Sequence, residues 1–266
     1  MLRLRFERRG ARTVLAGQRM TPPLQVMAPM ERADGSAYAV LLNNGGGLVG
    51  GDSMRIEIEL GAGSRVAITT ASAGKVYRSA GAAATHETII RIGTGARLDY
   101  LPDHLIPHAD AALVQRLSVV MERGSRAILY AAMAAGRIAR KERFAFRRIE
   151  DSTGVWYGGR PILLSRAILE PATRTLGGAG LMENFDYLAS MVVAGESSGE
   201  WGAIASGIRK RLEIGELNGG ASPLAADGCL VRWMAPGAEA LRRSAAAIHA
   251  GAAMLAFGES SLALRK

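Results

Sequence analysis

The feature that most constrains the fold is a short glycine-containing turn that recurs between strand-like segments. It occurs as Gly63-Ser64-Arg65-Val66, Gly95-Ala96-Arg97-Leu98 and Gly124-Ser125-Arg126-Ala127, with the glycines 32 and then 29 residues apart. Each copy follows one strand-like run and begins another. A strand, a tight turn and a second strand at near-regular intervals predict stacked hairpins or a helically wound sheet, in which each layer buries its neighbour's apolar face. The alternative is chance recurrence in a glycine-rich chain.

Apolar periodicity supports a mainly β chain. Alternating apolar and charged residues from Met54 to Leu60 are typical of a half-buried strand. Similar signals predict strands at residues 2–6, 13–20, 38–42, 142–149, 155–157, 162–169 and 187–194. Apolar residues at three- and four-residue spacing occur only late, at 201–212 and 241–254. We therefore predict one domain over residues 1–266, made of stacked or helically wound β-sheets with about two α-helices in the C-terminal third.

Composition excludes several classes of protein. Apolar residues make up 48% of the chain, yet no apolar run reaches membrane-spanning length, and Met1 to Arg5 lack the apolar core of a signal peptide. We expect a cytoplasmic protein with no membrane partner. The single cysteine, Cys229, excludes an internal disulfide framework and a cluster of soft metal ligands.

The charge balance is strongly basic. Lys and Arg number 33 against 24 Asp and Glu, which gives a net charge of +9. Such a balance makes a nucleic-acid-binding protein one alternative. However, aromatic content is only 5%, and we find no pattern of an RRM, KH or zinc-finger module. A solvated basic surface, or a face that docks acidic proteins, is the favoured interpretation, and no nucleic acid is expected as a partner.

The densest glycine cluster runs from Asn43 to Asp52. Gly45, Gly47 and Gly50 formally satisfy the dinucleotide-binding pattern G-x-G-x-x-G. That pattern must be followed by a helix whose N-terminal amides face the pyrophosphate, but a strand pattern follows here. A phosphate-binding P-loop is excluded because Asp52 stands where it would have lysine. We therefore predict a glycine-rich hairpin or bulge that presents the Asp52 carboxylate.

One enzymatic alternative comes from the segment Gly195–Gly199, which matches the G-x-S-x-G nucleophile elbow with Ser197 as the nucleophile. Asp227 and His249 follow in the order that an α/β-hydrolase uses. Against a serine hydrolase, the preceding chain has no alternation of strands and helices that would build the required sheet. The acid and base also lie within one short, partly helical stretch.

Two further polar clusters could bind ions. Asp103 and His104, followed by His108 and Asp110, place imidazoles and carboxylates in one loop, a mixture suited to Ni²⁺ or Zn²⁺. Prolines in this loop exclude a helical arrangement, so a polar surface loop is the other interpretation. The segment Lys75–Ser79 combines a cation, a phenol and a guanidinium that could hold an anion, or could form the polar face of a strand.

The order of the motifs says more than any single one. In sequence they are Gly46-Gly47-Leu48-Val49-Gly50-Gly51-Asp52, then Thr69-Thr70, then Lys75-Val76-Tyr77-Arg78-Ser79, then Leu101-Pro102-Asp103 with Ile106-Pro107, and finally Gly136-Arg137-Ile138-Ala139 with Glu142 and Phe144. This order and these separations resemble the urease accessory protein family UreD, also called UreH. The resemblance is specific from about residue 41 to residue 146 and loose beyond.

The resemblance implies a urease maturation chaperone and not an enzyme. Members of that family are largely β, with stacked sheets and a pair of helices. They act with apo-urease, UreF and UreG, and the GTPase UreG supplies nickel, which passes through the UreF and UreD assembly to the urease active site. The resemblance therefore implies no tightly bound cofactor, with nickel only in transit.

A path for a divalent cation needs oxygen or imidazole groups that bind weakly enough to release it. Asp52 and Glu142 are the first candidates for such transient contacts, followed by Asp103 and His104. The sequence departs from the family at Asn44, where proline is usual, at Lys141, where glycine is usual, and at the C-terminus.

Overall fold

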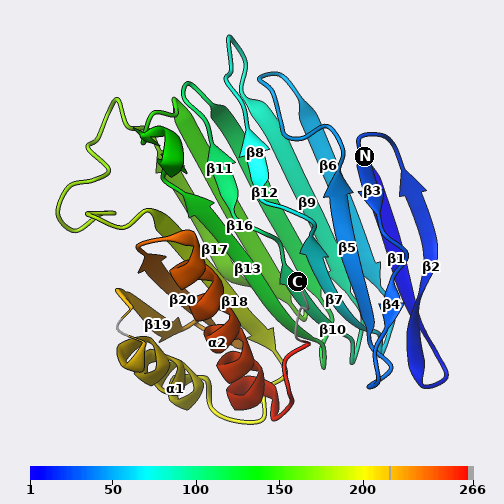
Figure 1. Ribbon diagram of the computed structural model, residues 1–266. Coiled ribbons are helices and arrows are strands. Elements are labelled where there is room, and N and C mark those ends of the chain that lie inside the picture. The colour runs from blue at the N-terminus through cyan, green and yellow to red at the C-terminus, as the bar shows by residue number, and fades with distance from the viewer. Residues whose placement is uncertain (216, 263–266) are drawn as a thin grey trace.

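The computed structural model describes residues 1–215 and 217–262. It shows two β-sheets packed face to face, here called sheet A and sheet B, with two helices on the outer side of sheet B (Figure 1). The prediction of a mainly β fold with two helices in the C-terminal third is confirmed.

Sheet A has seven strands and forms the rear layer in Figure 1. In spatial order they are β17 (Arg160–Leu169), β16 (Arg148–Tyr157), β12 (Ala112–Met121), β9 (Ala84–Ile92), β6 (Ser53–Leu60), β1 (Leu2–Arg9) and β2 (Arg12–Met20). Neighbours from β16 to β1 run parallel, whereas β17 and β2 pair antiparallel at the two edges.

Sheet B is larger and branches at its ends. Its main path is β19 (Gly219–Pro223), β20 (Gly228–Ala235), β18 (Tyr187–Gly195), β13 (Arg126–Ala134), β10 (Arg97–Leu101), β7 (Arg65–Thr70), β5 (Ala37–Asn43) and β3 (Leu24–Val26). Short strands β4 (Met30–Glu31), β8 (Gly74–Val76) and β11 (Leu105–Pro107) join off this path. Strands β5, β7, β10 and β13 are parallel, and the outer ones are antiparallel.

The chain is helically wound, because successive long strands alternate between the sheets. From β5 it crosses to β6 in sheet A, returns to β7 in sheet B, and continues in this way to β16. Large apolar side chains from both sheets fill the space between them, including Phe6, Ile58, Ile90 and Leu98, all at most 2% exposed. Each turn of this winding, here called a coil, therefore buries the apolar face of its neighbour, as the repeat predicts.

The repeated glycine turns form the corners that carry the chain from sheet A to sheet B. Gly63, Gly95 and Gly124 have φ angles of +67°, +67° and +77°, a left-handed conformation that glycine adopts without steric cost. The arginine that ends each turn begins the next strand of sheet B, so the parallel register stacks Arg65 beside Arg97 and Arg97 beside Arg126. We call these three residues the arginine ladder.

Helices α1 (Trp201–Ile214) and α2 (Ala238–Phe257) cover the end of sheet B formed by β13, β18 and β20 (Figure 1). Their apolar stripes, represented by Ile208 and Ile248, pack with Val231 and Trp233 in a second core. Helix α2 ends at Gly258, whose φ of +64° provides a left-handed C-cap. The chain then turns back toward the coils.

The arginine ladder binds the segment that follows α2. The Glu259 carboxylate lies 2.8 Å from Arg65, 3.0 Å from Arg97 and 2.7 Å from Arg126. Behind it, the buried Arg97 guanidinium donates two hydrogen bonds to Asp99, each 3.0 Å long. The repeat thus creates the arginine ladder, which fixes the segment after α2 to three successive coils.

His249 of α2 and the backbone N–H of Leu262 also contact the Asp99 carboxylate, at 2.7 and 3.1 Å. Burial alone would raise the pKa of Asp99, but hydrogen bonding to His249 and the charge of Arg97 hold that pKa below its usual value. Asp99 is therefore an ionised group that ties α2 and the following segment to the centre of sheet B.

Two local predictions are wrong. The glycine cluster is not a hairpin or bulge, because β5 before it lies in sheet B and β6 after it lies in sheet A. It is a crossover between the sheets. The single strand predicted at 142–149 is split into β15 (Glu142–Arg143), which pairs with β14 (Gly136–Arg137), and the start of β16. Phe144, with a φ of +57°, breaks the alternation.

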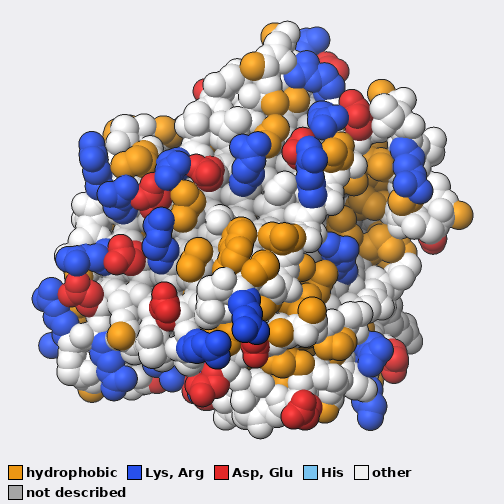
Figure 2. Space-filling model, turned by 180° about the vertical axis from the view of Figure 1, so that it is seen from behind, with side chains coloured by type: hydrophobic (Ala, Val, Ile, Leu, Met, Phe, Trp, Pro, Cys, Tyr) orange, Lys and Arg blue, Asp and Glu red, His pale blue; other side chains and the backbone are white. Residues whose placement is uncertain are grey.

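Charged residues of both signs share the outer face of sheet A (Figure 2). Arg3 lies 2.6 Å from Glu57, and Arg166 lies 2.8 Å from Glu150. This face therefore presents paired charges, unlike the single-sign stripe expected of a nucleic-acid groove.

Candidate functional site

The crossover Asn43–Asp52 packs tightly against β8 and the residues that follow it. The backbone N–H of Leu48 donates to the carbonyl of Lys75 at 2.9 Å, and Tyr77 N–H donates to the carbonyl of Leu48 at 2.7 Å. A Cβ on Gly47 would lie 2.6 Å from the carbonyl oxygen of Lys75. Glycine is required here because two backbone segments approach each other closely.

The Asp52 carboxylate closes this crossover. Its Oδ2 accepts a hydrogen bond from the backbone N–H of Val49 at 2.9 Å, and its own N–H donates to the Val49 carbonyl at 3.0 Å. The side chain is exposed and holds a turn in which Gly51 has a φ of +88°. Asp52 thus defines the shape of an exposed loop.

Contacts join the glycine crossover to the other motifs. The Tyr77 hydroxyl donates to the carbonyl of Gly46 at 3.3 Å, and the Tyr77 ring meets His108 edge-on at 4.8 Å. Arg78 lies 3.3 Å from Asp110, and both side chains are exposed. Burial and the charge of Arg137 lower the pKa of His108. Residues far apart in sequence thus gather at the upper end of the coils in Figure 1.

Strands β14 and β15 complete this end of the fold. They place Arg137 opposite Glu142, where the guanidinium binds both carboxylate oxygens, with one bond of 2.7 Å to Oε2. The same Oε2 accepts from the backbone N–H of Ala109 at 3.2 Å. Hydrogen bonding from Arg137 lowers the pKa of Glu142. Gly136 is needed because a Cβ would lie 1.9 Å from the Glu142 carbonyl oxygen.

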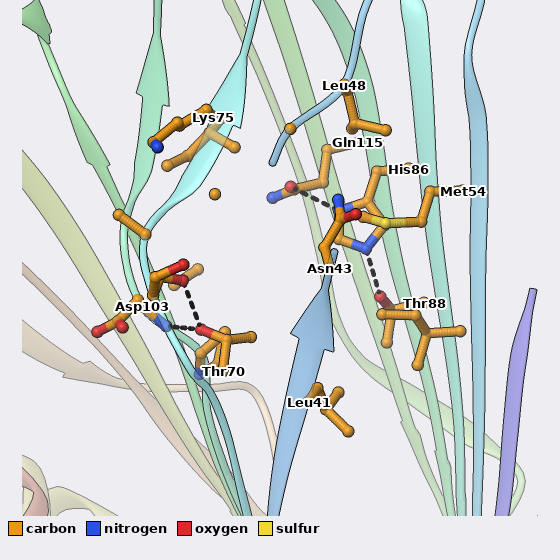
Figure 3. A pocket seen from close by; sticks show the side chains of 18 of the residues that line it. Leu41, Asn43, Leu48, Met54, Thr70, Lys75, His86, Thr88, Asp103 and Gln115 are labelled. Carbon is orange, nitrogen blue, oxygen red and sulfur yellow. Dashed lines mark hydrogen bonds between the residues drawn. The ribbon is translucent and has the colours of Figure 1, made fainter. Parts of the chain in front are cut away.

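A cavity of about 150 Å³ opens beneath this end, between the two sheets. Figure 3 shows Lys75, Thr70 and Asp103 along one wall and His86, Thr88 and Gln115 along the other. The backbone N–H of Asp103 donates to the Thr70 hydroxyl at 2.8 Å. Polar groups therefore face each other across an otherwise apolar interior.

Three polar side chains that line this cavity form a chain across sheet A, here called the polar ladder. His86 in β9, Gln115 in β12 and Asp151 in β16 lie in register and point into the space between the sheets. The Nδ1 of His86 lies 3.3 Å from Gln115 Oε1, and Gln115 Nε2 donates to Asp151 Oδ1 at 2.9 Å. The Nε2 of His86 lies 3.3 Å from the Thr88 hydroxyl.

Burial shifts the pKa of the residues at both ends of the polar ladder. It lowers the pKa of His86 to about 4, which leaves the imidazole neutral at physiological pH. Burial also raises the pKa of Asp151, although the hydrogen bond from Gln115 and the charge of Arg232 oppose the rise. A neutral imidazole and a carboxylate are ordinary ligands for Ni²⁺.

A larger groove of about 610 Å³ adjoins this cavity. Six residues line both spaces, and they are Leu105, Gln115, Ala131, Ala132, Asp151 and Thr153. The polar ladder therefore runs from the cavity beneath the motifs toward a groove between β17 and β18.

The four residues predicted to contact nickel lie in different environments. Asp103 lines the cavity, and the ring of His104 meets Tyr187 edge-on at 5.2 Å. Asp52 holds its own loop and Glu142 binds Arg137. Within residues 1–215 and 217–262, no group of three or more His, Cys, Asp or Glu side chains is placed to hold a metal ion.

No pattern in the sequence predicted the polar ladder. His86, Gln115 and Asp151 are separated by 29 and 36 residues, so nothing local links them. A signal does exist, because each occupies an inward position of a strand whose other inward positions are mostly apolar. Recognising it requires the register between parallel strands, which the sequence alone does not provide.

The segment Gly195–Gly199, predicted as a possible nucleophile elbow, is not arranged as part of a catalytic triad. The Ser197 hydroxyl donates to the carbonyl of Gly199 at 2.7 Å on the surface, whereas His249 is 5% exposed and its Nε2 lies 2.7 Å from Asp99. A Cβ on Gly195 would lie 2.0 Å from the carbonyl oxygen of Ser125, which accounts for that glycine by packing. These contacts do not join the serine to the histidine as a triad requires.

No helix in the described part of the chain is long and apolar enough to cross a membrane.

Comparisons with known proteins agree with the motif order. The model of the UreD urease accessory protein family matches residues 1–265. A urease accessory protein UreD of Deinococcus radiodurans is 32% identical over 268 aligned residues, which cover 100% of this chain and 94% of that protein. One from Herpetosiphon aurantiacus is 30% identical over 240 residues, 88% of this chain and 84% of that protein. The chain therefore belongs to the UreD urease accessory protein family and has a role in urease maturation.

Proposed function

We propose that this protein is a cytoplasmic, non-enzymatic factor that docks with UreF and UreG on apo-urease and provides an interior path for Ni²⁺ into the urease active site. The observation that carries the proposal is the polar ladder, which places His86, Gln115 and Asp151 across the space between two sheets. Family membership gives the urease context, and the adjoining cavity and groove give the space.

The chemistry of the interior suits passage better than storage. A cation in transit needs ligands that bind it without enclosing it. The polar ladder supplies one neutral imidazole, one amide and one carboxylate from a single wall, with Asp103 on the facing side. A net charge of +9 opposes accumulation of Ni²⁺ on the protein as a whole. Nickel is therefore the cargo and is not a resident cofactor.

We propose that Tyr77, Arg137 and Glu142, at the upper end of the coils, shape the protein surface and do not line the nickel path. Arg137 and Glu142 bind each other, Glu142 also binds the Ala109 N–H, and Tyr77 holds the glycine crossover. These contacts fix the shape of four loops around the cavity entrance. We infer that Asp52 and Glu142 support nickel transfer by shaping a docking surface, with Asp103 nearer to the cation.

The test is to co-express the urease subunits and the other accessory proteins with and without this chain and to measure nickel per urease active site. We expect much less nickel without it. Equal nickel in the two preparations would contradict the proposed function. Labelling by a fluorophosphonate that is lost in Ser197→Ala would instead support a serine hydrolase.

We expect Asp52→Ala to fold normally but to lower urease activation. The change removes the acceptor for the Val49 N–H, an exposed hydrogen bond that contributes about 1 kcal/mol. Fold is checked by circular dichroism, and activation by nickel per active site. Glu183→Ala is the matched control, because the Glu183 carboxylate accepts from the backbone N–H of Gly180, three residues before it, at 3.0 Å in another exposed loop. Unchanged activation in Asp52→Ala would mean that the crossover is only a turn.

A further inference from the structure

The hydrogen bonds of the polar ladder fix which ring nitrogen of His86 carries the proton. Gln115 Nε2 donates to Asp151 Oδ1 at 2.9 Å, so the amide oxygen of Gln115 is the atom turned toward His86. That oxygen lies 3.3 Å from His86 Nδ1. Because an amide oxygen only accepts hydrogen bonds, Nδ1 is the protonated nitrogen of the neutral imidazole, and Nε2 keeps its lone pair.

The lone pair on His86 Nε2 is occupied by the hydroxyl of Thr88. The two atoms lie 3.3 Å apart, and the hydroxyl must donate because Nε2 has no proton. His86 and Thr88 are two residues apart in β9, so both side chains lie on the inner face of sheet A and line the cavity (Figure 3). The hydrogen bonds therefore run in one direction, from Thr88 through His86 and Gln115 to the Asp151 carboxylate.

The packing around Thr88 would suit an apolar side chain of the same shape. Thr88 is 4% exposed, and its partners in the parallel register are Ile56 in β6 and Leu117 in β12. A buried hydroxyl costs free energy unless it is hydrogen-bonded, and His86 Nε2 provides an acceptor. The hydroxyl of Tyr100 also bonds to Thr88 and can donate to its oxygen at the same time. Thr88 is thus held with its proton on His86.

This arrangement leaves His86 in the form that binds metal ions. Histidines that bind metals commonly donate one ring N–H to a neighbouring acceptor, which fixes the tautomer and turns the other nitrogen toward the metal. Gln115, held by Asp151, is that acceptor here. The cavity of about 150 Å³ has space for a cation with bound water beside His86. A cation that coordinates Nε2 must first displace the Thr88 hydroxyl.

We propose that Thr88 is a positioning residue that keeps nickel binding at His86 weak, because its hydroxyl competes with Ni²⁺ for the Nε2 lone pair and returns to it when the cation leaves. Gln115 acts with Thr88 by holding the proton on Nδ1. The inference rests on the proposed function, since a path needs contacts that release their cargo. It assigns a role to a residue outside the polar ladder and predicts that loss of a hydrogen bond strengthens nickel binding.

The experiment measures the affinity of the full chain for Ni²⁺ alone, by competition with a chromophoric chelator. Thr88→Val is expected to bind Ni²⁺ about fivefold tighter than wild type, the effect of losing one competing neutral hydrogen bond. Thr88→Ser keeps the hydroxyl and is expected to bind as the wild type does. In a His86→Ala background, Thr88→Val is expected to leave the affinity unchanged, because the lone pair that it frees is absent.

Thr69→Val is the matched control. Thr69 is 1% exposed and its hydroxyl donates to the Leu101 carbonyl at 2.8 Å, but Thr69 does not line the cavity. This variant is expected to leave nickel affinity unchanged. Circular dichroism confirms that each variant is folded, and Thr88→Ala, which also lacks the hydroxyl, replaces Thr88→Val if the valine variant does not fold.

Nickel affinity in the folded hydroxyl-free variant that equals or falls below that of wild type would overturn the role of Thr88, and so would affinity too weak to measure in both. A gain that persists in the His86→Ala background would also overturn it, because the gain would then arise elsewhere. These outcomes concern Thr88 and leave the proposed function standing. Failure of the wild-type chain to raise urease nickel in the co-expression experiment would instead contradict the proposed function.

Discussion

Replacing Asp99 by alanine is expected to lower the free energy of unfolding by about 3–5 kcal/mol, because it removes the buried carboxylate that binds the Arg97 guanidinium and leaves that guanidinium with the partly exposed Glu259 alone. Arg97 is 2% exposed and Asp99 is fully buried. The variant also removes the acceptor for His249 and for the N–H of Leu262, so it loosens α2 and the segment after it. Urea denaturation followed by circular dichroism measures the change.

The matched control is Glu7→Ala, which removes a carboxylate from the exposed pair that Glu7 forms with Arg5 and should cost about 0–1 kcal/mol. The pH dependence has a definite sign. Because the folded-state pKa of Asp99 is lowered, its contribution is present above the unfolded pKa and is lost as pH falls through the folded pKa. Equal loss in Asp99→Ala and Glu7→Ala would show that the cluster around Asp99 contributes no more than a surface pair.

Replacing Asp151 by asparagine is expected to lower nickel loading of urease on the order of tenfold at limiting nickel, because the polar ladder loses its one carboxylate. Asparagine keeps the shape and can still accept the hydrogen bond from Gln115. The measurement is nickel per urease active site in the co-expression experiment, with nickel in the medium varied.

The free energy of unfolding of Asp151→Asn should not fall along with nickel loading. Burial raises the pKa of Asp151, so its ionised form costs stability at neutral pH, and its contribution becomes more favourable as pH falls through the raised pKa. Asp151→Asn should therefore be as stable as wild type at neutral pH, or more stable. Glu150→Gln is the matched control, because it removes the neighbouring carboxylate that binds Arg148 and Arg166 on the outer face of the same strand. Nickel loading in Asp151→Asn equal to that in Glu150→Gln would exclude the polar ladder from the path.

The sequence predicted the coil architecture well because its causes are local. Gly63, Gly95 and Gly124 require left-handed corners, and alternating apolar residues require strands with one buried face. The two helices could be predicted for the same reason, because apolar residues spaced three and four apart lie on one face of a helix. Strands β19 and β20 were missed, although Leu230 and Val231 belong to the ladder with β18.

The candidate site was only partly predictable. The motif order located the loops around Asp52, Tyr77, Asp103 and Glu142, and the structure brings those loops to one end of the coils. In the structure the Asp52 carboxylate caps its own turn and the Glu142 carboxylate binds Arg137, and their contacts with nickel stay predictions. A carboxylate's partner depends on segments distant in sequence, which no local pattern reveals.

The glycine turns by themselves predicted a repeat of strand, corner and strand, which fits stacked hairpins or a wound sheet, because alternating apolar residues on both sides of each turn require two strands with one buried face. The tertiary structure decided what the winding brings together. Parallel register stacked Arg65, Arg97 and Arg126 around Glu259, and it aligned His86, Gln115 and Asp151 across sheet A. The physical reason is that successive side chains of a strand point to alternate faces of the sheet, which the sequence pattern shows. Which side chains lie next to each other on neighbouring strands depends on the length of each coil and on the register between strands.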